Sequence, residues 1–200
     1  MSSSIIVALT KLIAGTGVRW TGCAPEIKQR IYFANHTSNL DALIVWTSLP
    51  KPIRARTRPV AARDYWIKGR VRRYLATKVF NAVLIERKKV TSNNNPLAFL
   101  LEALDQNFSL IIFPEGGRNT ESECGPFKSG LYHLGKNRPR VELIPAFIDN
   151  ANRILPKGEV LPVPLLSSIS FGSPIRVEQN ETKVQFLERA RNAVIQLKRS

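Results

Sequence analysis

Short apolar runs alternate along this chain with longer segments in which apolar residues recur at helical spacing. Runs rich in β-branched and aromatic residues predict strands, because these side chains favour an extended and buried backbone. The predicted strands cover residues 18–22, 31–34, 58–62, 82–85, 110–113, 141–148 and 167–171, and helices are predicted at 41–49, 64–80, 96–106, 129–136 and 181–198. This alternation predicts an α/β fold, a single domain whose central, mostly parallel or mixed sheet is flanked by helices.

Prolines and capping residues indicate where several elements begin and end. Pro50 and Pro52 are expected to stop the first helix, since proline cannot continue it. Asp64 and Asn95 precede apolar helical patterns and can cap the second and third helices. The segment 155–164 contains three prolines and predicts an extended loop.

The beginning of the chain differs from the rest. Residues 5–14 are apolar except for Thr10 and Lys11, and they have about half the length of a membrane-spanning helix. No basic side chain precedes Ile5, as a signal peptide would require. We therefore expect a short amphipathic helix at residues 1–16, which either lies on a membrane or caps the core. One domain is expected to follow over residues 17–200.

Composition narrows the class of protein. The chain has 200 residues, of which 44% are hydrophobic and 22% are charged, as in a globular domain. Its two cysteines, Cys23 and Cys124, exclude a disulfide framework and a four-cysteine zinc site. Two histidines leave little for a metal cage. We expect no bound metal and no resident cofactor.

Positive charge is concentrated in one region. The net charge is +15, and residues 51–89 hold thirteen basic and two acidic side chains. Aromatic and aliphatic residues are interleaved with these cations at Tyr65, Trp66, Ile67, Tyr74 and Phe80. Basic and aromatic residues together are typical of a surface that meets anionic lipid. An acidic acyl carrier protein or a nucleic acid are alternative partners for this charge.

The first candidate site is Asn-His-Thr-Ser-Asn-Leu-Asp at 35–41, between a predicted strand and a predicted helix. One turn can fold Asp41 back onto His36, so that the carboxylate accepts the Nδ1 proton and Nε2 is left as a base. Such a pair is commonly structural, but junctions of this kind often carry active-site loops. Ser38 is expected to cap the helix or to contact Asp41 rather than to act as a nucleophile.

A second motif, Phe-Pro-Glu-Gly-Gly-Arg at 113–118, follows a buried strand. Gly116 and Gly117 allow sharp turns and a close approach to a ligand. Arg118 offers a planar, permanent cation that suits phosphate, and Glu115 can hold Arg118 or a substrate hydroxyl. From these six residues alone, an ordinary surface turn is the commoner interpretation.

Two further motifs lie in predicted strands. Ile-Glu-Arg at 85–87 ends a strand and supplies Arg87 as a second cation for phosphate. Ile-Pro-Ala at 144–146 places Pro145 inside a strand, which predicts a sheet edge or a pocket wall.

In order and spacing, these motifs resemble the four sequence blocks of the glycerolipid acyltransferases, the family of 1-acylglycerol-3-phosphate and other lysophospholipid acyltransferases. The resemblance covers roughly residues 30 to 150. Phe-Lys-Ser-Gly at 127–130 also resembles the family's sequence after the third block. Gly117 replaces the Thr or Ser of many relatives, and the Glu of 85–87 replaces the more usual Asp.

The resemblance implies a glycerol-phosphate acyltransferase-like fold and transfer of a fatty acyl group from an acyl thioester to the free hydroxyl of a lysophospholipid. The default acceptor is 1-acyl-sn-glycerol 3-phosphate, the product is then phosphatidate, and the co-substrate is acyl-CoA or acyl carrier protein. Transfer is direct, with His36 and Asp41 as the general-base pair. The implied acceptor-binding residues are Arg87, Glu115, Gly116, Gly117 and Arg118, and the possible pocket-wall residues are Ser38, Lys128 and Pro145.

The resemblance also implies a peripheral or monotopic enzyme on the cytoplasmic face of a membrane. Two alternatives are held beside it. A basic nucleic-acid-binding protein would explain the charge, but it would leave the four motifs unexplained. A non-catalytic lipid-binding relative would have no reason to keep His36, Asp41, Glu115 and Arg118 together.

Overall fold

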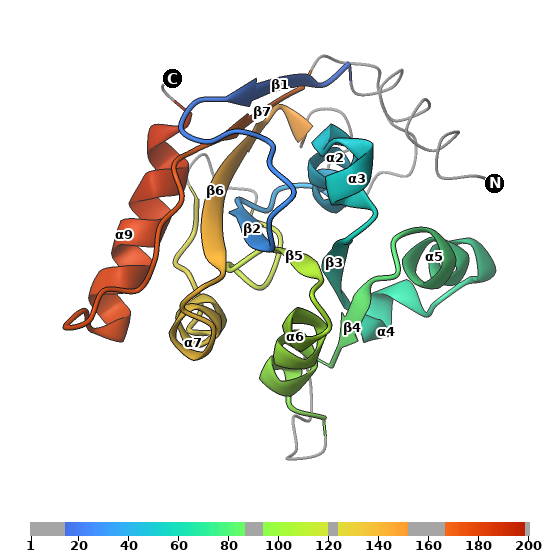
Figure 1. Cartoon of the computed structure of the whole chain (residues 1–200). Helices are drawn as coiled ribbons and strands as arrows, with labels where there is room; N and C mark the ends of the chain where they lie inside the picture. The colour runs from blue at the N-terminus through green and yellow to red at the C-terminus, as the bar shows by residue number, and fades with distance from the viewer. Residues whose placement is uncertain (1–14, 87–93, 120–123, 152–166, 199–200) are drawn as a thin grey trace.

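Seven strands form one sheet at the centre of the computed structural model, which describes residues 15–86, 94–119, 124–151 and 167–198 (Figure 1). The strands are β1 (Gly17–Trp20), β2 (Arg30–Ala34), β3 (Thr57–Ala62), β4 (Val83–Ile85), β5 (Ser109–Ile112), β6 (Glu142–Asp149) and β7 (Ser168–Phe171). Their order across the sheet is β1-β7-β6-β2-β5-β3-β4. All neighbouring pairs are parallel except β6 and β7, so the sheet is mixed but mostly parallel.

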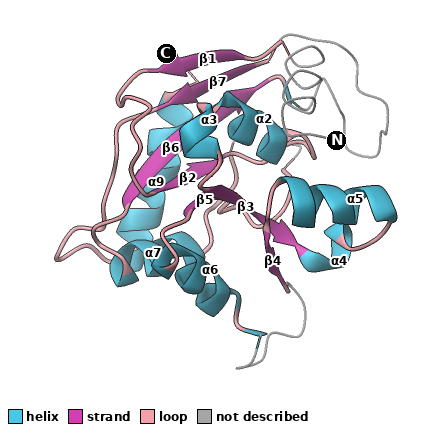
Figure 2. Ribbon diagram, turned by 45° about the vertical axis from the view of Figure 1, so that its right-hand side comes forward, coloured by secondary structure: helices cyan, strands magenta, loops and turns pink. Residues whose placement is uncertain are grey.

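Helices cover both faces of this sheet (Figures 1 and 2). The helical elements are α2 (Asp41–Ser48), α3 (Lys51–Arg54), α4 (Arg63–Trp66), α5 (Arg70–Tyr74), the π-helical turn η1 (Leu75–Val79), α6 (Pro96–Asp105), α7 (Gly130–Asn137) and α9 (Lys183–Gln196). The packing is that of a single α/β domain, as the alternating pattern predicts.

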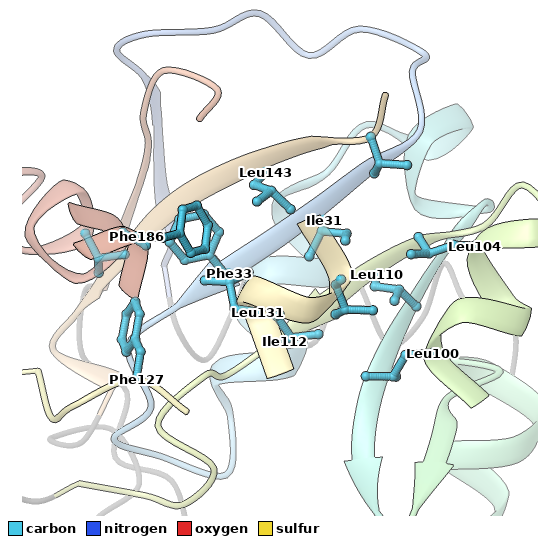
Figure 3. Packing of buried hydrophobic residues seen from close by; sticks show 14 of the residues in the cluster. Ile31, Phe33, Leu100, Leu104, Leu110, Ile112, Phe127, Leu131, Leu143 and Phe186 are labelled. Carbon is cyan, nitrogen blue, oxygen red and sulfur yellow. The ribbon is translucent and has the colours of Figure 1, made fainter. Parts of the chain in front are cut away.

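Two apolar clusters lie on opposite faces of the sheet. On one face, residues of α6, α7 and α9 pack against Ile31, Phe33 and Leu110 (Figure 3). On the other face, α2 and α3 pack against Tyr32 and Ile111. All five residues of β2 are buried, because this strand lies inside the sheet with helices on both sides.

The predicted strands are all present, with ends within two residues of the expected positions. Four of the five predicted helices are also confirmed. The side chain of Asn95 caps α6 by accepting the Leu97 N–H at 3.0 Å. One short helix was not predicted: Pro52 lies in the first turn of α3, where proline is tolerated because no hydrogen-bond donor is needed there.

The prediction of one helix over residues 64–80 is wrong. The chain forms α4, turns at Gly69, and continues as α5 and η1. Gly69 has a φ of +92°, which no residue in a right-handed helix adopts, and this interrupts the helical run. Asp64 lies inside the first turn of α4 and does not cap it, since Ala62 occupies the N-cap position.

Several predictions fall outside the described residues. They are the helix at 1–16, apart from its last two residues, the loop at 155–164, and the position of Arg87. Among the described helices, none has both the length and the apolar character that crossing a bilayer requires.

Candidate active site

The sheet brings two predicted motifs to the same edge. In the parallel register of β2 and β5, Phe33 lies opposite Ile112. The loops that follow these strands therefore emerge side by side at the carboxyl edge of the sheet, where α/β proteins bind their ligands. One loop begins with Asn35 and His36, and the other begins with Phe113.

His36 and Asp41 form the predicted pair. The His36 Nδ1 lies 2.8 Å from Asp41 Oδ2, and the Asp41 side chain is fully buried. The same Oδ2 accepts the N–H groups of Thr37 at 2.6 Å and Ser38 at 2.8 Å. An ionised carboxylate is suited to three donors, so Nδ1 carries the proton and Nε2 is left as the acceptor.

The ring of His36 is also packed against Phe113, and the backbone around it is anchored to the sheet. It stacks on Phe113 with a centroid distance of 4.3 Å and an interplanar angle of 21°. Asn35 extends the β2–β6 pairing by one step, because its side chain accepts the Ile148 N–H and donates to the Ile148 carbonyl. The residue before His36 is therefore anchored to the sheet. Only 22% of the His36 side chain is exposed.

Glu115 joins the two loops. Its Oε1 accepts the backbone N–H of His36 at 2.8 Å, and its Oε2 accepts the backbone N–H of Gly125 at 2.9 Å. A third contact runs in the opposite direction, since Asn119 donates its N–H to the His36 carbonyl at 2.7 Å. Both oxygens of Glu115 thus accept backbone donors, and among the described residues no ion pair joins Glu115 to Arg118. A contact of Glu115 with a substrate hydroxyl stays a prediction.

Gly116 has a φ of +72°, and its hydrogen faces the side chain of Lys128. A β-carbon at this position would lie 2.6 Å from Lys128 Nζ and 2.7 Å from Cε. The backbone of the Lys128 residue is fixed to the same loop, because its N–H donates to the Pro114 carbonyl at 2.8 Å. The backbone angle therefore favours glycine, and a β-carbon there would require the end of the flexible Lys128 side chain to move.

A cavity of about 530 Å³ opens beside the His36 ring. Its walls are mostly apolar and come from α2, the ends of β3 and β4, α4, η1, α6 and α7. The lining contains two cationic side chains, Arg118 and Lys128, and the imidazole of His36. Among the described residues, no hydrogen bond or ion pair occupies the Arg118 guanidinium. The cavity thus combines an apolar interior with a base and two cations.

Two predicted pocket-wall residues lie elsewhere. Within the described part of the chain, Ser38 and Pro145 do not line the cavity. Ser38 is buried and contacts Asp41 through its backbone N–H, which confirms the alternative of an Asp41 partner. Pro145 lies inside the sheet between β2 and the chain after β7, and not at an edge.

The reason why proline is accepted there is a bulge. Ala146 pairs with Phe171, and Leu143 forms a bridge with Ile175. The segment from 143 to 146 in β6 therefore faces a segment that is one residue longer, from 171 to 175. The extra residue disrupts the ladder of hydrogen bonds beside Pro145, and a missing N–H is tolerated at such a position.

Cys124 lies beside Glu115 but is suited to packing rather than to chemistry. Its Sγ is 3.5 Å from Glu115 Oε1, and the residue is buried. Burial, together with the nearby Glu115 carboxylate, raises the pKa of the Cys124 thiol to about 12. A thiol of this kind remains protonated at neutral pH and is a poor nucleophile. Cys124 is therefore a free, buried thiol.

Sequence reasoning missed three contributors to the site. Phe113 was predicted as the end of a strand and the first residue of the second motif, but no role was assigned to its ring, which stacks on His36. Asn119 and Gly125 act through their backbone N–H groups. No side-chain pattern marks such a role, so the sequence offers no signal for it.

Comparison with known proteins gives consistent matches. A family model described as Acyltransferase matches residues 19–149. The 1-acyl-sn-glycerol-3-phosphate acyltransferase of Limnanthes douglasii is 26% identical over 180 residues, which cover 87% of this chain and 60% of that protein. The 1-acyl-sn-glycerol-3-phosphate acyltransferase alpha of Mus musculus is 28% identical over 136 residues, which cover 68% of this chain and 45% of that protein.

A solved structure shares the fold. The crystal structure of the 1-acyl-sn-glycerophosphate (LPA) acyltransferase PlsC from Thermotoga maritima matches with a TM-score of 0.75 at 19% identity, covering 98% of this chain and 78% of that one. This likeness confirms the predicted fold class. The alignments with the first curated relatives span about three fifths of their length.

Proposed function

Because this chain belongs to the Acyltransferase family, we propose that it transfers a fatty acyl group from an acyl thioester to the free hydroxyl of a lysophospholipid. The default acceptor is 1-acyl-sn-glycerol 3-phosphate, in keeping with the names of the curated relatives. The observation that carries the proposal is the His36–Asp41 pair, which lies against an apolar cavity with two cations in its lining.

The reaction needs a base because an alcohol is a poor nucleophile at neutral pH. In the proposed step, the acceptor hydroxyl gives its proton to His36 Nε2 while its oxygen attacks the thioester carbonyl carbon. Asp41 stabilises the imidazolium that forms. The tetrahedral intermediate then breaks its carbon–sulfur bond, and the leaving thiolate takes the proton from His36. The acyl group passes directly between the substrates, and no covalent intermediate on the protein is needed.

The cavity supplies the binding that this reaction requires. Its apolar walls suit a fatty acyl chain, and its volume lies in the usual range for small-molecule sites, about 300–1,000 Å³. Arg118 and Lys128 are suited to the acceptor phosphate, since a guanidinium binds phosphate oxygens in pairs and an ammonium binds them as a point charge. Holding both substrates beside one base can contribute roughly 7–11 kcal/mol to the rate enhancement.

The co-substrate belongs to the same proposal. The donor is acyl-CoA or acyl carrier protein, both of which are anionic and complement a chain of net charge +15. The acceptor is a membrane lipid, so the proposal includes peripheral attachment to a membrane. No metal or resident cofactor takes part in the proposed step.

The proposal is tested with the purified full chain, a mixture of lysophospholipids and an acyl thioester, with products identified by mass spectrometry. Wild-type protein is expected to acylate a lysophospholipid, and His36→Ala is expected to lose about 10²–10⁴-fold in kcat. Circular dichroism of the variant checks that it folds. Unchanged turnover in a folded His36→Ala variant would show that His36 is not the base.

A further inference from the structure

Residues 67–74 form a protruding surface, which we call the α5 surface. Every one of these eight residues is exposed, and α5 itself contributes no buried residue. Figures 1 and 2 both show α5 at the periphery of the molecule, on the side opposite α9. The α5 helix continues directly into η1, whose buried Ala76 anchors it to the core, so α5 can present its own side chains to the surroundings.

The α5 surface is apolar at its centre. Val71 is 72% exposed, Tyr74 is 43% exposed and Ile67 is 36% exposed. Val71 and Tyr74 are three residues apart and so lie on the same face of α5. Exposed apolar side chains gathered in one place indicate an interaction site.

Cations surround these apolar side chains. Between Arg63 and Val79 there are six basic residues and one acidic residue, Asp64. Two of the six have partners that fix them to the body of the protein, because Arg63 pairs with Glu86 at 3.5 Å and Arg72 lies over the Tyr65 ring at 4.5 Å. The remaining four cations are Lys68, Arg70, Arg73 and Lys78.

The other side of the same segment lines the cavity. Tyr65 and Trp66 of α4, and Leu75 and Ala76 of η1, belong to its walls. The α5 surface thus lies between two stretches that form the apolar binding site. A lipid bound to this surface would therefore lie next to segments that line the cavity.

From this arrangement we infer that an anionic lipid bilayer docks on the α5 surface and that the acceptor lipid enters the cavity from this side. Cations with exposed aliphatic and aromatic side chains between them fit the charged headgroups and the acyl boundary of a bilayer. A nucleic acid would match the cations but would leave Val71 facing phosphates and water. The entry of the lipid rests on the proposed function, whereas the docking does not.

The docking is tested by sedimentation with vesicles of phosphatidylcholine alone and of equal parts phosphatidylcholine and phosphatidylglycerol. The readout is the ratio of binding to the two kinds of vesicle, because an apolar segment elsewhere in the chain would bind both. The double variant Arg70→Gln/Arg73→Gln is expected to lose about 25-fold in binding to the anionic vesicles, at about fivefold per charge. Val71→Asp is expected to lose at least about tenfold.

Matched control variants carry the same changes far from α5. Arg140→Gln/Lys183→Gln removes two charges, and Val184→Asp alters a valine of α9 that is 63% exposed. We expect these variants to keep the wild-type ratio of anionic to neutral vesicle binding within about twofold, since α9 and the turn between α7 and β6 lie away from α5 (Figure 1). Thermal melting confirms that all variants fold.

A second readout separates docking from catalysis. A short-chain lysophosphatidate dissolved as a monomer and the same headgroup embedded in anionic vesicles are compared as acceptors. The α5 variants are expected to keep the wild-type rate on the monomer and to lose their rate on vesicles. If wild-type protein acylates neither acceptor, the proposed function is wrong, and the sedimentation ratio still decides the docking.

Two results would overturn the inference. One is that both α5 variants keep the wild-type ratio of binding to anionic and to neutral vesicles. The other is tight binding of duplex DNA that the α5 variants lose, with no preference of the wild-type protein for anionic vesicles, which would assign the surface to nucleic acid.

Discussion

Replacing Glu115 by Gln tests how His36, the proposed base, is held in place. The Glu115 carboxylate accepts one N–H from each of two separate segments, His36 at 2.8 Å and Gly125 at 2.9 Å. Glutamine has the same shape but only one acceptor oxygen, and its –NH₂ group can only donate. In Glu115→Gln one of the two backbone donors therefore faces another donor, and the other keeps a bond without charge assistance.

The expected cost follows from these two bonds. A hydrogen bond to a charged group contributes about 1.5–3 kcal/mol, and a neutral one about 0.5–1.5 kcal/mol. Losing one charged bond and weakening the other would cost about 2–4 kcal/mol in a dry interior. Glu115 is only partly buried, so solvent screening favours the lower end, about 2 kcal/mol. For a chain of this length, that lowers Tm by about 4–8 °C.

Thermal unfolding followed by circular dichroism measures this change, and steady-state kinetics measures its effect on the reaction. We expect kcat to fall by about 10–100-fold with a smaller change in KM, because the carboxylate positions the base and does not hold the phosphate. Glu102→Gln on the exposed face of α6 is the matched control, and its Tm is expected to change by less than about 2 °C. A Glu115→Gln variant with wild-type Tm and kcat would show that the hydrogen bonds from Glu115 to His36 and Gly125, which we call the Glu115 clamp, do not hold the two loops together.

Three other substitutions and modifications have defined outcomes. Gly116→Ala places a β-carbon against Lys128 at a φ of +72°, so we expect a fall of about 1–3 kcal/mol in the free energy of unfolding and a higher acceptor KM, measured by urea titration and kinetics. Asn95→Ala removes the cap of α6 and should cost about 1 kcal/mol in the same titration with kcat unchanged. With iodoacetamide at about pH 8, Cys23 should be alkylated well before Cys124, whose pKa is raised to about 12 by burial, and mass spectrometry of tryptic peptides gives the order. Equal labelling of the two cysteines would contradict the buried environment of Cys124.

Much of the fold could be predicted because its signals are local. A strand such as β2 is apolar throughout, since both of its faces are buried, and a run of this kind is visible in the sequence. The break at Gly69 was missed because a single glycine inside a helical pattern is often tolerated. The single helix over residues 64–80 does not form because the tertiary arrangement directs α5 away from the core. A pattern of apolar positions in the sequence does not reveal this arrangement.

The site divides in the same way. His36 and Asp41 are five residues apart, so one turn joins them and their spacing predicts the contact. The Glu115 clamp joins segments that are 79 residues apart in sequence and uses backbone N–H groups, which no residue type encodes. The motif at 113–118 predicted a charged loop for phosphate. In the structure its two charged residues differ: the Glu115 carboxylate binds backbone N–H groups of the protein, and Arg118 lines the cavity.

The contacts around His36 imply that its supports are coupled. Asp41 holds Nδ1, Phe113 covers the ring, and Glu115 holds the backbone N–H, so each acts on the placement of the same imidazole. Once one support is lost and the ring is misplaced, losing another adds less than it would alone. The double variant Asp41→Asn/Glu115→Gln should therefore lose less in kcat than the product of the two single losses. In the proposed function Arg118 acts on the substrate and not on the placement of His36, so the losses of Arg118→Gln and Glu115→Gln should multiply fully in the double variant. Kinetics of the three single and two double variants measure this contrast.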